Sequence, residues 1–113
     1  MSNVTIYHNP RCTKSRQTLA LLKEQGVEPD VIEYLDHPPD VKQLTAIVKK
    51  LGIAPRDLVR RKEFRELGVD EPPADKDWLQ LMADNPRIIE RPIVVSGNRA
   101  ALGRPPENVL EIL

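Results

Sequence analysis

The sequence has almost no cysteine and no excess of either charge, and each lack excludes a class of protein. Cys12 is the only cysteine among 113 residues, so no disulfide can form within the chain, and folds held together by disulfides are excluded. Lys and Arg total 17, as do Asp and Glu. A protein that binds polyanions without specificity should instead be basic. We therefore expect no nucleic-acid partner.

Long hydrophobic runs are also lacking. The longest span only a few residues, far short of the roughly 20 that cross a bilayer, so no membrane function is expected. The N-terminal stretch 1–8 has neither a cationic flank nor an apolar export signal, which predicts a cytoplasmic protein. The chain is 40% hydrophobic and 30% charged, as in a folded globule, and its length suits one domain, residues 1–113.

The first third of the chain has a strand-helix-strand pattern. A β-branched and aromatic run at 4–7 predicts a strand, 13–25 predicts a helix that ends before Gly26, and 31–35 predicts a second strand. Strands so connected pair in parallel through a right-handed crossover.

The middle of the chain predicts a helical insertion at about 38–87. An amphipathic helix covers 41–51 and ends at Gly52, and a shorter helix starts at Pro55 and runs into Arg60 and Arg61. A third helix, marked by Trp78, ends before Pro86.

The last third predicts a hairpin and a final helix. Residues 93–95 and 100–102 read as antiparallel strands around a tight turn at 97–98, and the prolines at 105–106 start a helix. The order β-α-β, helical insertion, β-β-α predicts an α/β, thioredoxin-like fold with a mixed sheet.

Cys12 lies where the first strand gives way to the first helix. Unpaired backbone N–H groups and the positive end of the helix dipole favour a thiolate there, as do Arg11 and Arg16 nearby. Ser15 stands where a dithiol enzyme would carry a second cysteine, so an oxidised Cys12 needs an external thiol.

Two supporting residues have open roles. Ser15 either donates a hydrogen bond to the thiolate or satisfies the first turn of the helix. His8 either contacts or electrostatically stabilises the sulfur, or is a solvated loop residue.

Three arginines are candidate anion ligands. Arg60 is expected at the end of the short helix, Arg91 precedes Pro92 and a buried strand, and Arg104 follows the hairpin. A thioredoxin-like sheet would bring Arg91 and Arg104 to Cys12, where they would bind an oxyanion and lower the cysteine pKa. Pro92 stands where such folds carry a cis-proline, so we expect a cis Arg91–Pro92 bond.

These motifs resemble the ArsC family of glutaredoxin-coupled arsenate reductases across the whole chain. The matching segments are 6–12 with Ser15 and Arg16, 58–60, 90–95 and 103–107. The resemblance implies that Cys12 attacks arsenate held by Arg60, Arg91 and Arg104. Arg61 is an alternative to Arg60.

The resemblance also implies partners and a sequence of steps. Cys12 displaces an arsenic-bound oxygen as water, glutathione adds to the adduct, and glutaredoxin supplies the electrons that release arsenite. No bound cofactor or metal is expected, and the implied role is arsenic detoxification. The chain resembles the shorter ArsC-like branch, in which another oxyanion could be the physiological substrate.

Two alternatives remain. Spx-type regulators share this fold and bind RNA polymerase, but many carry the Cys-x-x-Cys switch that Ser15 excludes here. The other alternative is a glutathione-linked thiol reductase without oxyanion specificity. The set of three arginines favours an oxyanion reductase over both alternatives.

Overall fold

The structure is a computed structural model that describes residues 3–113, and these form two compact units. The first unit joins the chain up to His37 with Arg91–Leu113, and the second is Pro38–Glu90. The single-domain organisation expected for residues 1–113 stays a prediction. No helix within residues 3–113 is long and apolar enough to cross a membrane.

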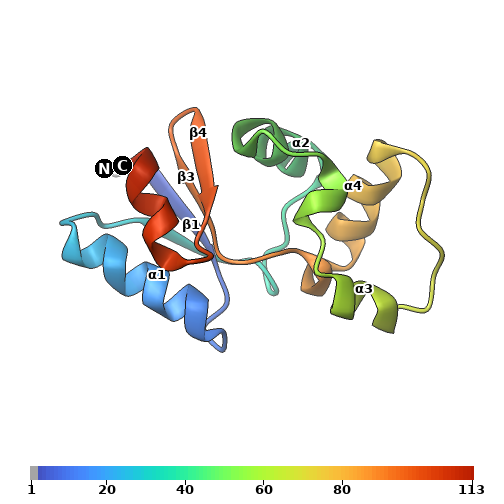
Figure 1. The fold of residues 1–113 in the computed structure, drawn as a ribbon, viewed down its shortest axis with the longest axis horizontal. Helices are drawn as coiled ribbons and strands as arrows, with labels where there is room; N and C mark the ends of the chain where they lie inside the picture. The colour runs from blue at the N-terminus through green and yellow to red at the C-terminus, as the bar shows by residue number, and fades with distance from the viewer. Residues whose placement is uncertain (1–2) are drawn as a thin grey trace. The chain divides into compact units, whose positions relative to one another are not determined.

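The first unit is built on a four-stranded mixed sheet in the order β2-β1-β3-β4 (Figure 1). β1 (Val4–His8) pairs in parallel with β2 (Asp30–Glu33) and antiparallel with β3 (Ile93–Ser96). β3 in turn pairs antiparallel with β4 (Arg99–Leu102) around a turn in which Gly97 has φ +60°. These pairings confirm the predicted α/β fold with a mixed sheet.

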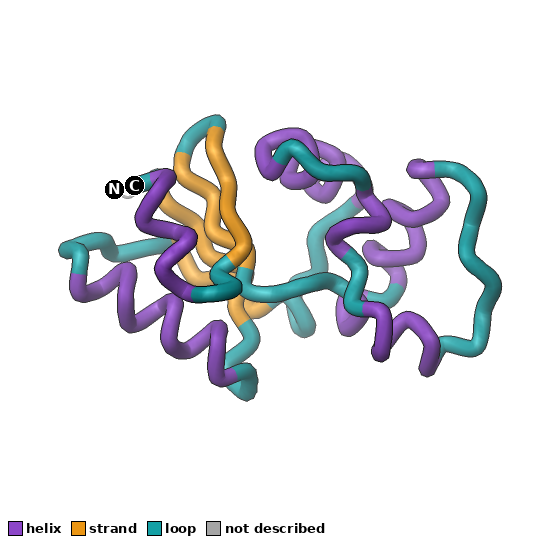
Figure 2. The backbone as a smooth tube through the Cα atoms, viewed as in Figure 1, coloured by secondary structure: helices purple, strands orange, loops and turns teal. Residues whose placement is uncertain are grey.

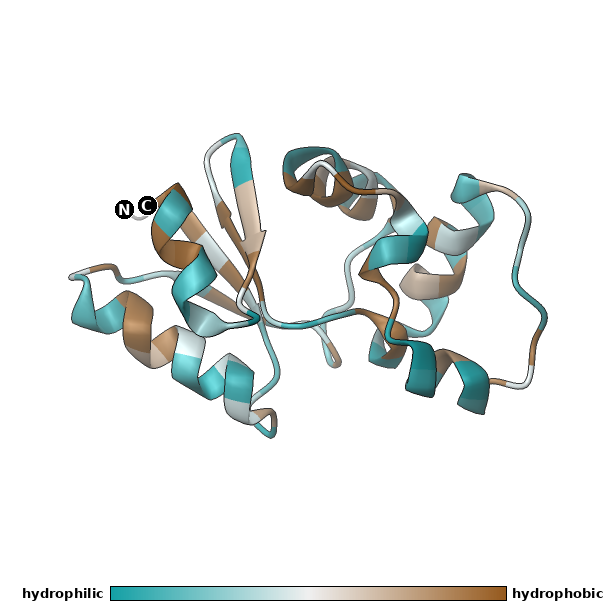
Figure 3. Cartoon of the chain, in the orientation of Figure 1, coloured by the Kyte–Doolittle hydropathy of each residue, from teal (hydrophilic) through white to brown (hydrophobic). Residues whose placement is uncertain are grey.

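One face of the sheet carries α1 (Thr13–Glu24) and the 3-10 helix η3 (Pro106–Ile112), which lie side by side (Figure 2). Hydrophobic residues from both helices and from β1 and β3 form the core of this unit, and hydrophilic residues cover the outer faces of the helices (Figure 3). The buried residues of this core are Val4, Ile6, Leu22, Val94, Val109 and Ile112.

The end of β2 and the type of the final helix differ from the sequence prediction. β2 ends at Glu33 and not at residue 35, because the Glu33 carbonyl accepts hydrogen bonds from the N–H groups of Asp36 and His37 and closes a turn. The final helix is a 3-10 helix in which Pro106, Val109 and Ile112 are buried. A spacing of three residues suits its three residues per turn.

The second unit is helical. Its elements are α2 (Val41–Leu51), η1 (Pro55–Leu58), α3 (Arg61–Glu66), α4 (Asp75–Asp84) and η2 (Pro86–Ile88). α2 and α4 confirm the predicted helices. Asp40 and Gln43 form a capping box at the start of α2, and Gly52 ends it with φ +71°.

The predicted place of Arg60 at the end of a helix is wrong. The short helix ends at Leu58, and Val59 and Arg60 are extended. The Arg60 N–H donates to the Ile88 carbonyl at 2.7 Å, and the Glu90 N–H donates to the Leu58 carbonyl at 2.7 Å. Because this pairing joins segments that lie 30 residues apart in the sequence, no local sequence pattern predicts it. Arg60 therefore caps the start of α3, a helix that the sequence prediction missed.

Gly103 allows two segments of the first unit to approach closely. Its N–H donates to the Pro92 carbonyl at 3.0 Å. A Cβ at this position would lie 2.8 Å from Pro92 Cγ and 3.1 Å from Thr18 Cγ2, and closer still to Thr18 Oγ1. No side chain fits there without displacing α1 or the segment before β3.

Gly103→Ala is therefore expected to lower the free energy of unfolding by about 1–3 kcal/mol, the usual cost of overpacking. Thr18→Ala in the same chain removes two of the three clashing atoms and should recover part of the loss. Denaturant unfolding of the two single variants and the double variant measures both effects. A Gly103→Ala protein as stable as the parent would contradict the close approach.

Candidate active site

The site begins at the end of β1, whose alternation fixes the direction of His8. Val4, Ile6 and His8 are buried on the same face of the strand, because residues two apart share a face. That face carries α1, so the His8 ring reaches Ser15 on the first turn of this helix. The contact between His8 at the end of β1 and Ser15 thereby fixes the position of the first turn of α1.

A tight turn connects His8 to Cys12. The Cys12 N–H donates to the Asn9 carbonyl at 3.0 Å, and the Arg11 N–H donates to the Asn9 side-chain oxygen at 3.0 Å. Asn9 itself is buried, and its N–H donates to Ser15 Oγ at 3.0 Å. The sequence prediction did not single out Asn9, although Asn is a frequent turn former.

Cys12 is the N-cap residue of α1. Its backbone is extended, with φ −93° and ψ 123°, and its carbonyl accepts the first helical hydrogen bond from the Arg16 N–H at 3.0 Å. The sulfur makes no regular capping hydrogen bond, and the first turn of α1 contains no acidic residue. The unpaired N–H groups and the helix dipole therefore act on the thiol without a competing anion in that turn.

Ser15 and His8 form a buried pair behind Cys12. Ser15 Oγ lies 2.6 Å from His8 Nδ1, and both residues are buried. Burial lowers the pKa of His8, and Arg16 and Lys23 add to this, against the opposing charge of Glu33. With a neutral ring, the Ser15 hydroxyl accepts from the Asn9 N–H and donates to His8.

The structure shows where the two supporting side chains lie. The Ser15 side chain is engaged with His8 and the Asn9 backbone, which secures the turn that carries Cys12. His8 is buried and bonded to Ser15, so it is not a solvated loop residue. Both side chains support the turn.

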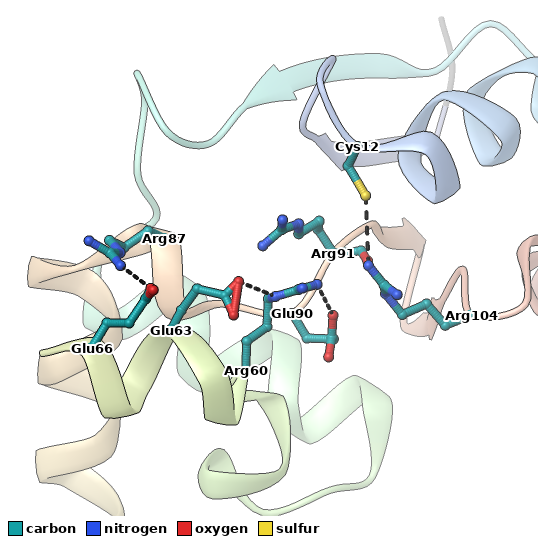
Figure 4. A network of polar contacts seen from close by, with 8 residues as sticks. All are labelled: Cys12, Arg60, Glu63, Glu66, Arg87, Glu90, Arg91 and Arg104. Atoms are coloured by element: carbon teal, nitrogen blue, oxygen red, sulfur yellow. Dashed lines mark hydrogen bonds and ion pairs between the residues drawn. The ribbon is translucent and has the colours of Figure 1, made fainter.

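Arg91 and Arg104 are brought to Cys12 although they lie far away in sequence. Arg104 Nη2 is 3.7 Å from Cys12 Sγ, and Arg104 Nε donates to the Arg91 carbonyl at 2.7 Å (Figure 4). The Arg104 carbonyl accepts from Asn108 Nδ2 at 3.1 Å, a contact that the sequence did not reveal. Each arginine also precedes a cis peptide bond to a proline. The cis Arg91–Pro92 bond confirms the expectation, and the cis Arg104–Pro105 bond was not anticipated.

These contacts lower the pKa of the Cys12 thiol. Burial alone would raise this pKa, but the Ser15 backbone N–H, the hydrogen bonding and charge of Arg91 and the charge of Arg104 outweigh it. Cys12 is partly exposed. The site therefore places a partly exposed thiol with a lowered pKa next to two guanidinium groups, and its thiolate form can attack an oxyanion that these groups bind.

Arg60 belongs to the second unit, where two carboxylates hold it. Its Nε donates to Glu63 at 2.8 Å, and its Nη1 donates to Glu90 at 3.1 Å (Figure 4). Burial opposes the charge on Arg60, but the bonds and charges of these carboxylates raise its pKa. The neighbouring Arg61 pairs instead with Glu71 and stacks on Trp78. Within residues 3–113, no three His, Cys, Asp or Glu side chains are grouped to hold a metal ion.

The lowered pKa leads to a direct prediction. The single thiol should titrate with a midpoint below the ordinary value of about 8.5, and Arg104→Ala should raise that midpoint because it removes a cation 3.7 Å from the sulfur. The pH dependence of thiolate absorbance and of alkylation rate measures it. Arg99→Ala is the matched control, since Arg99 bonds to the Glu111 carbonyl and pairs with Ser96 at the other end of the sheet. A midpoint at or above the ordinary value would contradict the lowered pKa of Cys12.

Comparison with known proteins gives consistent matches over the whole chain. The model of the ArsC family matches residues 7–112. An arsenate reductase of Neisseria meningitidis is 47% identical over the full length of both chains, and an uncharacterised Escherichia coli protein, YfgD, is 52% identical over 97% of this chain and 96% of its own. The solved structure of an arsenate reductase from Vibrio cholerae superposes with a TM-score of 0.92, at 48% identity and 97% coverage of both chains.

The fold of these relatives is the thioredoxin-like one that the sequence predicted. In this chain β1 ends at His8, four residues before Cys12, Cys12 is the N-cap residue of α1, and Arg91 precedes a cis-proline. On the family match and the full-length identity, the chain belongs to the ArsC family.

Proposed function

We propose that this protein reduces arsenate to arsenite, with the Cys12 thiolate as the nucleophile. The observation that carries the proposal is the 3.7 Å contact between Cys12 Sγ and Arg104 Nη2 at the N-terminus of α1. Its support is the name arsenate reductase on relatives 44–47% identical to this chain.

The arginines are proposed as the substrate ligands. Arg91 and Arg104 offer planar N–H pairs that match the oxygens of a tetrahedral oxyanion, and they neutralise its charge as the thiolate approaches. Arg60 is assigned a third contact on its sequence motif. Arg61, which pairs with Glu71 and lies over the Trp78 ring, stays the alternative to Arg60.

An external thiol is proposed as the reductant, because the chain has no second cysteine. The Cys12 thiolate forms a sulfur–arsenic bond, and one arsenic-bound oxygen leaves as water. Glutathione then displaces a second arsenic-bound oxygen as water. The thiol of glutaredoxin attacks the sulfur of the bound glutathione and forms a mixed disulfide, and the electron pair of the broken sulfur–arsenic bond stays on arsenic as As(III). Water then cleaves the bond between Cys12 and arsenic and releases arsenite. Overall, two thiols become one disulfide while As(V) becomes As(III) and water is released. The cytoplasm, where thiols are kept reduced, is the compartment that this chemistry requires.

The test is turnover of arsenate by the purified protein with glutathione and glutaredoxin. Release of arsenite should depend on both thiol sources and vanish in Cys12→Ser. Reduction of disulfides without reduction of arsenate would favour the thiol reductase, and binding to RNA polymerase without either activity would favour the Spx-type regulator.

Replacing arginine by lysine separates charge from geometry. Arg91→Lys and Arg104→Lys keep a cation near Cys12 but lose the planar pair of donors, so turnover should fall by roughly 10- to 150-fold, equivalent to about 1.5–3 kcal/mol. The pKa of Cys12 should barely change. Arg99→Lys is the control for a lysine elsewhere in the first unit. Full arsenate turnover in both lysine variants would contradict an orienting role.

A further inference from the structure

A groove of the first unit lies beside the turn that carries Cys12. Its volume is about 340 Å³, within the range of about 300–1,000 Å³ that is usual for sites of small ligands. Residues 8–11 line one side of the groove, and Glu33, Leu35 and Asp36 line the other. Cys12 itself does not line it. The groove can therefore hold a part of a ligand that does not react.

Hydrogen bonds fix both sides of this groove. On one side, the Arg11 N–H donates to the Asn9 side-chain oxygen at 3.0 Å, and the Cys12 N–H donates to the Asn9 carbonyl at 3.0 Å. On the other side, the Asp36 N–H donates to the Glu33 carbonyl at 3.0 Å. The groove is thus formed before a ligand arrives, and binding does not have to order either turn.

The groove carries charges of both signs that the protein does not pair. Arg11 lies on one side, and Glu33 and Asp36 lie on the other. Within residues 3–113, none of these three side chains takes part in an ion pair. The charge of Glu33 also acts on His8, whose pKa is lowered. A ligand with an ammonium group next to a carboxylate would match both sides, whereas the two protein carboxylates repel a simple anion.

The groove is close enough to Cys12 to serve the proposed reaction. The bond between the Cys12 N–H and the Asn9 carbonyl closes a four-residue turn, whose end Cα atoms lie less than about 7 Å apart. Asn9 lines the groove. The γ-glutamyl head group of glutathione carries its ammonium and carboxylate on one carbon, roughly 7 Å, or two residue lengths, from the cysteinyl residue. A head group in the groove therefore leaves the glutathione sulfur within reach of Cys12.

We propose that this groove binds the γ-glutamyl head group of glutathione, with its carboxylate on Arg11 and its ammonium on Glu33 and Asp36. The inference rests on the proposed function, in which glutathione is the external thiol. Leu35 is 44% exposed and lines the groove, so it offers an apolar contact to the methylene groups that follow the head group. The groove then directs the glutathione thiol to the arsenic on Cys12.

The sign of the effect separates recognition of the head group from attraction by charge alone. Glutathione has two carboxylates and one ammonium group, so its net charge is negative. If charge alone governed binding, Glu33→Gln and Asp36→Asn would remove repulsion and strengthen it. Recognition of the head group predicts the opposite. Each of these variants, and Arg11→Gln, should bind roughly two- to fivefold more weakly, as expected for exposed charge pairs.

The probe is S-methylglutathione, which has the same head group but no free thiol. Its titration into the full-length protein is followed by NMR of the backbone amides, which gives both affinity and location. We expect shifts within residues 8–11 and 33–36. Lys14→Gln and Glu24→Gln are the matched controls, because each removes one charge from α1 and neither residue lines the groove. Both controls should bind the probe as the parent does.

A second probe tests which part of glutathione is recognised. S-methyl-cysteinylglycine lacks the γ-glutamyl group and should not shift the amides of residues 8–11 and 33–36. In turnover assays of Arg11→Gln and Asp36→Asn, KM for glutathione should rise while KM for arsenate stays unchanged. A KM for arsenate that rises equally would contradict a site specific to the thiol.

The outcomes for this inference and for the proposed function differ. Equal or tighter binding of S-methylglutathione in Glu33→Gln and Asp36→Asn overturns the site, as does the absence of shifts at residues 8–11 and 33–36. Either result leaves the reductase proposal standing as long as the parent reduces arsenate. Binding in the groove as expected, by a parent protein without arsenate turnover, supports the site and overturns the reductase proposal.

Discussion

The chemistry of this protein depends on one constraint, the fixed start of α1 directly after β1. The alternation of β1 turns His8 toward the helix, and the buried Ser15 hydroxyl joins His8 to the Asn9 backbone. This connection leaves Cys12 as the N-cap residue, with a sulfur exposed to backbone N–H groups. Burial would raise the pKa of Cys12, but the Ser15 backbone N–H, Arg91 and Arg104 outweigh it and lower this pKa.

Arg104, one of the two arginines of the first unit, is set by backbone contacts. Arg104 follows Gly103, which has no room for a side chain against Thr18 and Pro92, and Arg104 Nε donates to the Arg91 carbonyl. A charge placed by such a scaffold needs little reorganisation when an anion arrives, which is what electrostatic preorganisation requires. In the second unit Arg60 is held by carboxylates instead of by carbonyls. The two units therefore use different means to fix a guanidinium.

Local patterns predicted the parts of the fold that local forces determine. The β-branched run of β1, the amphipathic period of α2 with its Gly52 end, and the hairpin around Gly97 each follow from backbone preference and side-chain alternation. Contacts between distant segments were not predictable in this way. Tertiary structure determines the extended conformation of Arg60 and the hydrogen bond from the Glu90 N–H to the Leu58 carbonyl, which belong to the same pairing of two segments. It also determines the hydrogen bond from Arg104 Nε to the Arg91 carbonyl. The motif around Cys12 identified the nucleophile candidate because a lone thiol between a strand and a helix has few other uses.

The central claim is that Cys12 forms a bond to arsenic, and the most direct test observes that bond. The protein is incubated with arsenate and glutathione but without glutaredoxin, small molecules are removed, and X-ray absorption at the arsenic edge is recorded on the protein fraction. The account predicts an arsenic–sulfur bond in the parent protein and none in Cys12→Ser. Arsenic bound only to oxygen in the parent, or the same arsenic–sulfur signal in Cys12→Ser, would contradict it.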